Sequence, residues 1–205
     1  PYAGKLHEIL VNINQSITLS EDNIYSRQEI PDRTLIVAIT SNKGLCGAFN
    51  ANINKQTVNL LNEDFQEDYK AGNVQVYSIG KKGTEFFKSK NIPMLGFNNE
   101  VLNNLSFDAA LPIIEDIMHR YVKREFDKVI IVYNKFKNAA VQVLTAEQFL
   151  PIELPQGIES EGNFDFIFEP DKEYIVKELI PKSLKIQFYE TMLESLAAEH
   201  GARMT

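Results

Sequence analysis

One cysteine and no tryptophan occur among the 205 residues. Cys46 alone cannot form an internal disulfide or a cysteine zinc cluster, and a single cysteine fits a reducing compartment. No apolar run approaches the roughly 18 residues of a membrane-spanning helix, and no signal-peptide pattern opens the chain. We therefore expect neither a disulfide-rich secreted domain nor an integral membrane protein.

Positive charge is also scarce. The chain has 21 Lys and Arg against 28 Asp and Glu, a net charge of −7 and a pI of about 5.1. Because binding to phosphate backbones requires clustered Lys and Arg, this balance argues against a nucleic-acid partner. The short basic stretch at 81–90 is typical of a solvated helix face.

Apolar residues make up 44% of the chain, enough for one sizeable core. Short apolar runs predict strands at 34–39 and 128–133, and alternation of apolar and polar residues predicts a strand at 73–79. Helices are predicted over about 50–62 and within 80–91. This alternation predicts an α/β fold, a Rossmann-like, largely parallel sheet flanked by helices. Further strands predicted at 139–145 and 164–169 would add an antiparallel portion.

A helix following residue 107 has the clearest pattern. Asp108 is its expected N-cap, and Pro112 is expected near the first turn, where a missing N–H costs little. The predicted inward stripe consists of Ala110, Ile113, Ile114, Ile117 and Tyr121.

Amphipathic helices are predicted at both ends of the chain. The first carries an apolar stripe of Leu6, Ile9, Leu10, Ile13 and Ile17. The second runs from residue 171, is kinked or restarted by Pro181, and has Tyr189, Leu193, Leu196 and Ala197 on one face. Two arrangements remain open: the helices pair as an antiparallel coiled coil, or both pack on the sheet.

The loop SNKGLCGAFN (41–50) lies where α/β proteins bind phosphate. Its spacing, Gly44-x-x-Gly47, matches neither the dinucleotide nor the phosphate-loop pattern, and Lys43 precedes the glycines. This favours a structural turn, formed by Gly44, Cys46 and Gly47, in which the glycines supply positive φ or close backbone packing.

No catalytic set is evident. A nucleophilic Cys46 would need a base, yet His7, His119 and His200 all fall on predicted helices among charged residues. The carboxylates form no acid–base or metal pattern, so we expect no catalytic residue, metal or cofactor.

Five segments, in order, resemble the gamma subunit of F-type ATP synthases. They are PYAGKLHEIL, ITSNKGLCGAFN, SIGKKGTEFFKSKN, FDKVIIVYNKFKNAAVQVLTAEQFLPI and LESLAAEHGARMT. The second is similar to the family pattern (S/T)-D-R-G-L-C-G-x-x-N, and the last to E-x-L-A-S-E-Q-A-A-R-M. Asn42 and Lys43 replace the usual Asp-Arg, and His200 and Gly201 replace the usual Gln-Ala.

The resemblance implies a non-catalytic rotor of the central stalk. It implies the end of an N-terminal coiled-coil helix at 1–20, a globular domain at 21–170 and the start of a C-terminal coiled-coil helix at 171–205. Most of both family helices is expected to be missing. The implied partners are the epsilon subunit, the membrane rotor ring driven by proton or sodium flow, and the alpha and beta subunits. The implied location of the chain is peripheral, on the cytoplasmic side of a bacterial plasma membrane.

The resemblance also assigns two residues to a contact with the catalytic subunits, Arg203 and Glu199. From spacing alone, Glu199 is equally suited to pair with Arg203 across one helical turn. Gly201 costs a helix roughly 1 kcal/mol relative to Ala, which predicts weak helical order at that end. Two alternatives stay open: a small α/β nucleotide-binding enzyme using the 44–47 loop, and a free-standing interaction module.

Overall fold

A computed structural model describes residues 24–26, 30–153 and 174–204. Within these ranges one sheet has the strand order β3-β2-β1-β4-β5. The strands are β1 (Thr34–Ile39), β2 (Val74–Ile79), β3 (Met94–Asn98), β4 (Lys128–Asn138) and β5 (Val141–Leu150). All neighbours pair in parallel except β4 and β5, which are antiparallel. The predicted Rossmann-like, largely parallel sheet is confirmed.

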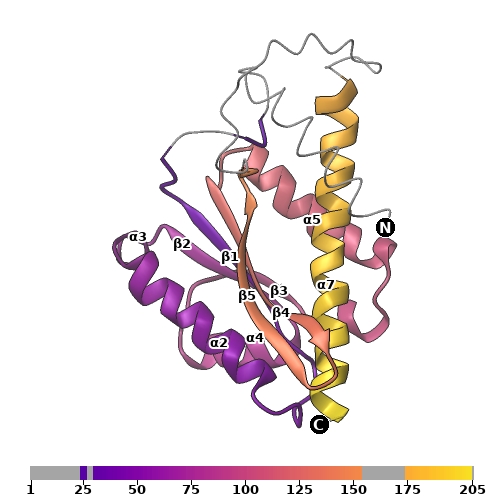
Figure 1. Cartoon of the computed structure of the whole chain (residues 1–205). Coiled ribbons are helices and arrows are strands. Elements are labelled where there is room, and N and C mark those ends of the chain that lie inside the picture. The colour runs from indigo at the N-terminus through magenta and orange to yellow at the C-terminus, as the bar shows by residue number, and fades with distance from the viewer. Residues whose placement is uncertain (1–23, 27–29, 154–173, 205) are drawn as a thin grey trace, which may run out of the picture.

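Helices cover both faces of the sheet in three layers (Figure 1). The α-helices are α2 (Phe49–Asn59), α3 (Gln66–Lys70), α4 (Lys81–Ser89), α5 (Phe107–Val122) and α7 (Ile180–Met204). A π-helical segment, Leu60–Asp64, joins α2 to α3; a 3₁₀ turn, Val101–Asn104, precedes α5; and a second π-helical segment, Ile175–Leu179, leads into α7. Helices α2 and α4 lie on one face and α5 on the other. The first part of α7 packs on the α5 side, whereas Ala198 near its end belongs to the cluster on the α2 side.

The core explains why β1 is a continuous apolar run. All six of its residues are buried. Leu35, Val37 and Ile39 pack with α5 and α7, whereas Ile36 and Ala38 pack with α2 on the opposite face. A strand covered on both faces has no polar positions to alternate with apolar ones.

Strand prediction was wrong in two places. Strand β3 was missed because it is a half-buried edge strand interrupted by Gly96, and so has no buried apolar run. The strand expected at 139–145 is β5, which begins after a turn at 139–140 and extends to Leu150. The predicted strand at 164–169 and the predicted helix at 1–17 lie outside the described residues.

Helix α5 has the predicted inward stripe, all five residues of which are buried, but not the predicted cap. The N-cap is Ser106, whose Oγ accepts a hydrogen bond from the Ala109 N–H at 3.1 Å. Asp108 lies instead in the first turn, where its charge complements the helix dipole. Pro112 is the sixth residue of the helix, beyond the first turn.

Helix α7 begins at Ile180 with Pro181 in its first turn, which confirms the predicted restart. None of the four residues of the predicted apolar face, Tyr189, Leu193, Leu196 and Ala197, is buried. Leu193 is 41% exposed, and the buried residues are Ile180, Leu184, Phe188, Thr191, Met192, Ser195, Ala198 and Gly201. The predicted face consists of apolar residues alone, whereas half of the buried residues are small or polar.

Candidate functional site

The loop after β1 opens at the point where strand order reverses. From β1 the chain passes through α2 to β2, whereas β4, on the other side of β1, is reached through α5 on the opposite face. Open α/β sheets bind ligands in the crevice at such a point. Here Asn134, within β4 and 2% exposed, donates from Nδ2 to the Phe49 carbonyl of α2 at 3.1 Å and so connects β4 to α2.

Hydrogen bonds within the loop hold Cys46 in place. The Ser41 N–H donates to Asn50 Oδ1 at 2.9 Å, and Asn50 Nδ2 donates to Cys46 Sγ at 3.2 Å. Cys46 is 2% exposed. Among the described residues its polar contacts are Ser41, Asn50 and the Lys43 carbonyl, and none of these is a base. The arrangement is that of a packed turn residue.

The two glycines have different roles. Gly47 has φ +58°, which an L side chain rarely adopts, as the structural interpretation of this loop predicts. Gly44 needs neither positive φ nor close packing, because a Cβ there would meet Lys82 Cε at an ordinary 3.9 Å. The second left-handed residue is instead Leu45, with φ +60° and 98% exposure. The glycine prediction therefore holds at Gly47 and is wrong at Gly44.

The C-terminal helix contributes Arg203 to this loop. Arg203 Nε and Nη2 donate to Glu199 Oε1 at 3.0 and 2.6 Å, so the one-turn pair exists. Arg203 Nη1 also donates to the Gly44 carbonyl at 2.7 Å, and Nη2 to the Lys43 carbonyl at 3.0 Å. The loop thus turns two consecutive carbonyls toward a cation, whereas a phosphate site requires convergent N–H groups. This geometry does not favour nucleotide binding at 44–47.

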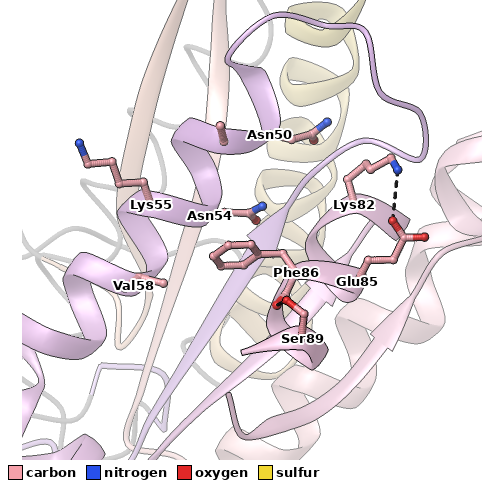
Figure 2. Close-up of a pocket in the computed structure, with 9 residues that line it drawn as sticks. Asn50, Asn54, Lys55, Val58, Lys82, Glu85, Phe86 and Ser89 are labelled. Atoms are coloured by element: carbon pink, nitrogen blue, oxygen red, sulfur yellow. Dashed lines mark hydrogen bonds and ion pairs between the residues drawn. The ribbon is translucent and has the colours of Figure 1, made fainter. Parts of the chain in front are cut away.

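A groove of about 680 Å³ lies between α2 and α4 (Figure 2). It is lined by Asn50, Ala51, Asn54, Lys55, Val58, Lys82, Glu85, Phe86 and Ser89. Asn54 Oδ1 is buried and has no hydrogen-bond donor within the described part of the chain. Lys82 Nζ is paired with Glu85 Oε2 at 3.1 Å. The apolar lining residues Ala51, Val58 and Phe86, with the unpaired Asn54 Oδ1, suit the binding of another side chain better than catalysis.

The remaining titratable groups build no reactive centre in the ranges described. His119 and His200 are exposed on α5 and α7, and His7 lies outside those ranges. Burial and the charge of Glu147 raise the pKa of the Tyr133 phenol, which stays neutral and donates to Glu147 Oε1 at 3.1 Å. No group of three or more His, Cys, Asp or Glu suited to a metal occurs among the described residues. In the same part of the chain, no helix combines the length and apolarity needed to cross a membrane.

Comparison with known proteins assigns the family. The family model described as ATP synthase matches residues 1–205. The ATP synthase gamma chain of Cytophaga hutchinsonii is 48% identical over 212 residues, which cover 100% of this chain and 70% of that protein. The gamma chain of Christiangramia forsetii is 44% identical over 207 residues, with the same coverage. The chain belongs to the ATP synthase gamma-chain family.

Solved structures agree with this family at the level of fold. A central-stalk chain of the Tetrahymena thermophila mitochondrial ATP synthase matches with a TM-score of 0.65 and 23% identity, covering 98% of this chain and 92% of its own. A rotor chain of the Euglena gracilis enzyme matches with a TM-score of 0.58 and 20% identity, covering 99% and 83%. Gamma chains are non-catalytic subunits of the central stalk, so the packed turn at 44–47 belongs to a rotor subunit.

Proposed function

We propose that this gamma chain couples rotation of the membrane ring to ATP synthesis in the catalytic hexamer of alpha and beta subunits, with proton or sodium flow as the driving force. In this proposal residues 21–170 form the globular domain, which docks to the epsilon subunit and the ring. The subunit is peripheral to the membrane, held on the cytoplasmic side of a bacterial plasma membrane through the complex.

The observation that carries the proposal is an apolar stripe on α7 that the globular domain covers only in part. Ile186 is 39% exposed and Leu193, seven residues later, is 41% exposed. Tyr189 and Leu196, half-buried, interleave with them at spacings of three and four. This is the heptad spacing of a coiled-coil seam.

Residues 1–20 are the proposed partner of this stripe, as the end of an N-terminal coiled-coil helix. Their sequence has apolar residues at the matching spacing, from Leu6 to Ile17. Residues 171–205 would then begin the C-terminal helix of an antiparallel pair. The seam supports a shaft role because a paired helix resists bending and twisting better than a single one.

Arg203 and Glu199 lie at the end of the same helix, and we propose that they also face the catalytic subunits in the complex. The Arg203 side chain keeps 27% exposure and that of Glu199 keeps 13%. An acidic group of a neighbouring subunit could therefore approach the guanidinium without breaking its bonds within the chain.

Reconstitution tests the proposal. The full-length subunit should co-purify with epsilon, alpha and beta from the same organism and restore ATP-driven ion pumping to vesicles that contain the ring. Replacing both seam residues, Ile186→Glu with Leu193→Glu, should abolish pumping, whereas exposed Glu190→Gln on the same helix should preserve it. A chain that binds none of these subunits, yet binds millimolar ATP by calorimetry, would refute the rotor assignment.

A further inference from the structure

Helix α7 is fastened to the globular domain by polar contacts near its start, middle and end. Near its start, Lys185 Nζ donates to Glu115 Oε1 of α5 at 2.9 Å. In its middle, Glu194 Oε2 accepts the Phe136 N–H of β4 at 3.0 Å. At its end, Arg203 bonds to the loop after β1. The third contact differs from the other two because it holds an irregular segment.

The Arg203 contact is a preorganised fork. Glu199 Oε1 accepts from both Nε and Nη2, so the guanidinium is oriented before it reaches the loop. Its Nη1 and Nη2 then donate to the carbonyls of Gly44 and Lys43. A planar guanidinium with two donors on two consecutive carbonyls fixes the orientation of both peptide groups, which a single ammonium cannot do.

The loop needs such a restraint. Leu45 has a left-handed φ of +60° and is 98% exposed, so its own side chain packs on nothing that would hold this conformation. The Lys43 carbonyl also accepts from Ser41 Oγ at 2.7 Å, which links the Arg203 fork to the end of β1. A bridge thus runs from α7 through Arg203 and Lys43 to Ser41, next to the central strand.

We propose that Arg203 is a positioning residue that clamps the 41–47 loop to the C-terminal helix, so that helix and sheet turn as one body. The proposal rests on the rotor function for its mechanical meaning, but the clamp itself is a property of the free chain. Glu199 orients the clamp, and Leu45 is the side chain whose position the clamp fixes.

Hydrogen exchange of the free full-length subunit tests the clamp. In Arg203→Gln, the Ser41 and Phe49 amides, which donate to Asn50 Oδ1 and the Cys46 carbonyl, should exchange about tenfold faster. Arg203→Lys should give an intermediate rate. The matched control is Arg120→Gln, which removes the ion pairs of Arg120 on α5 with Asp116 and Glu125. Loop exchange should not change in this control.

The assembled complex tests the mechanical role. Arg203→Gln should lower the number of ions pumped per ATP hydrolysed, Arg203→Lys should restore part of it, and Arg120→Gln should leave it unchanged. Circular dichroism of each variant verifies that the fold survives.

Unchanged loop exchange in Arg203→Gln would overturn the clamp, even if pumping fell, because Arg203 would then act on a neighbouring subunit. Faster loop exchange with an unchanged pumping ratio would overturn the claim that helix and sheet turn as one body. A chain that fails to assemble counts against the rotor function alone, since the exchange experiment does not depend on assembly.

Discussion

Gly201 of α7 lies against the carbonyl oxygen of Ala139 at the β4–β5 turn. A Cβ on Gly201 would lie 3.2 Å from that oxygen and 3.3 Å from Gln142 Nε2. The predicted weak helical order at Gly201 is therefore wrong: the glycine permits a close approach of α7 to the hairpin, and the helix continues through it to Met204.

Enlarging this residue should separate the helix from the hairpin. We expect Gly201→Leu to lower the free energy of unfolding by about 1–3 kcal/mol, because overpacking forces backbone shifts. Gly201→Ala should be close to neutral, since a gain in helix propensity of about 1 kcal/mol opposes the tight contact. Urea denaturation measures both. His200→Leu, exposed on the same helix, is the control, and an effect as large as that of Gly201→Leu would contradict the explanation.

The cap of α5 gives a second prediction. Ser106→Ala should cost about 1 kcal/mol, because it removes the acceptor of the Ala109 N–H. Asp108→Ala should cost only a few tenths of a kcal/mol, because the Asp108 carboxylate interacts with the helix dipole but does not cap the helix. Thermal unfolding of the two variants decides between the caps. A larger loss for Asp108→Ala would restore the cap that the sequence predicts.

The two faces of α7 should respond differently to truncation. Met192 is fully buried, so Met192→Ala should destabilise the chain by about 2–4 kcal/mol. Its neighbour Leu193 is 41% exposed, and Leu193→Ala should cost less than about 1 kcal/mol in the free chain. Chemical denaturation of both variants tests which face packs on the domain. Equal losses would show that the Leu193 face is also covered in the free chain.

Asp127 should make stability depend on pH at the acid end. Burial alone would raise its pKa, but hydrogen bonds from the Arg33 N–H and Nε, with the Arg33 charge, lower the pKa below the ordinary 3.8. The carboxylate therefore stabilises the fold above that value, and the stabilisation is lost as pH falls through the folded-state pKa. Asp127→Ala should cost about 1–2 kcal/mol at pH 7 and less at pH 3. Denaturation at both pH values measures this.

Glu67 is the control for that experiment, since its pair with Lys70 is 85% and 61% exposed. Glu67→Ala should change stability little at either pH, because exposed ion pairs contribute little. An Asp127→Ala loss that is the same at pH 3 and pH 7 would show that the side chain acts by packing and not by charge.

The sheet could be predicted from the sequence wherever burial on both faces leaves an uninterrupted apolar run. Strands β1 and β4 meet this condition, whereas β2 is predicted by its alternation of apolar and polar residues, which matches its alternating burial. The predicted starts of all three strands lie within one residue of the observed ones. The edge strand β3 does not meet the condition, because solvent on one side removes the requirement for apolar residues. The loop could be recognised from Gly47, but the left-handed conformation of Leu45 could not, since leucine carries no signal for it.

The sequence by itself determined the class of fold, the turn at Gly47 and the pairing of Glu199 with Arg203, because all of these depend on residues that are near one another along the chain. Only the tertiary structure decided which face of α7 is buried and why Gly201 is small. It alone brought Arg203 to the carbonyls of Lys43 and Gly44, about 160 residues away. Such contacts join distant segments through the packing of a helix on a sheet. Because every residue has the same backbone carbonyl, no pattern of side chains in the sequence predicts which carbonyl Arg203 will contact.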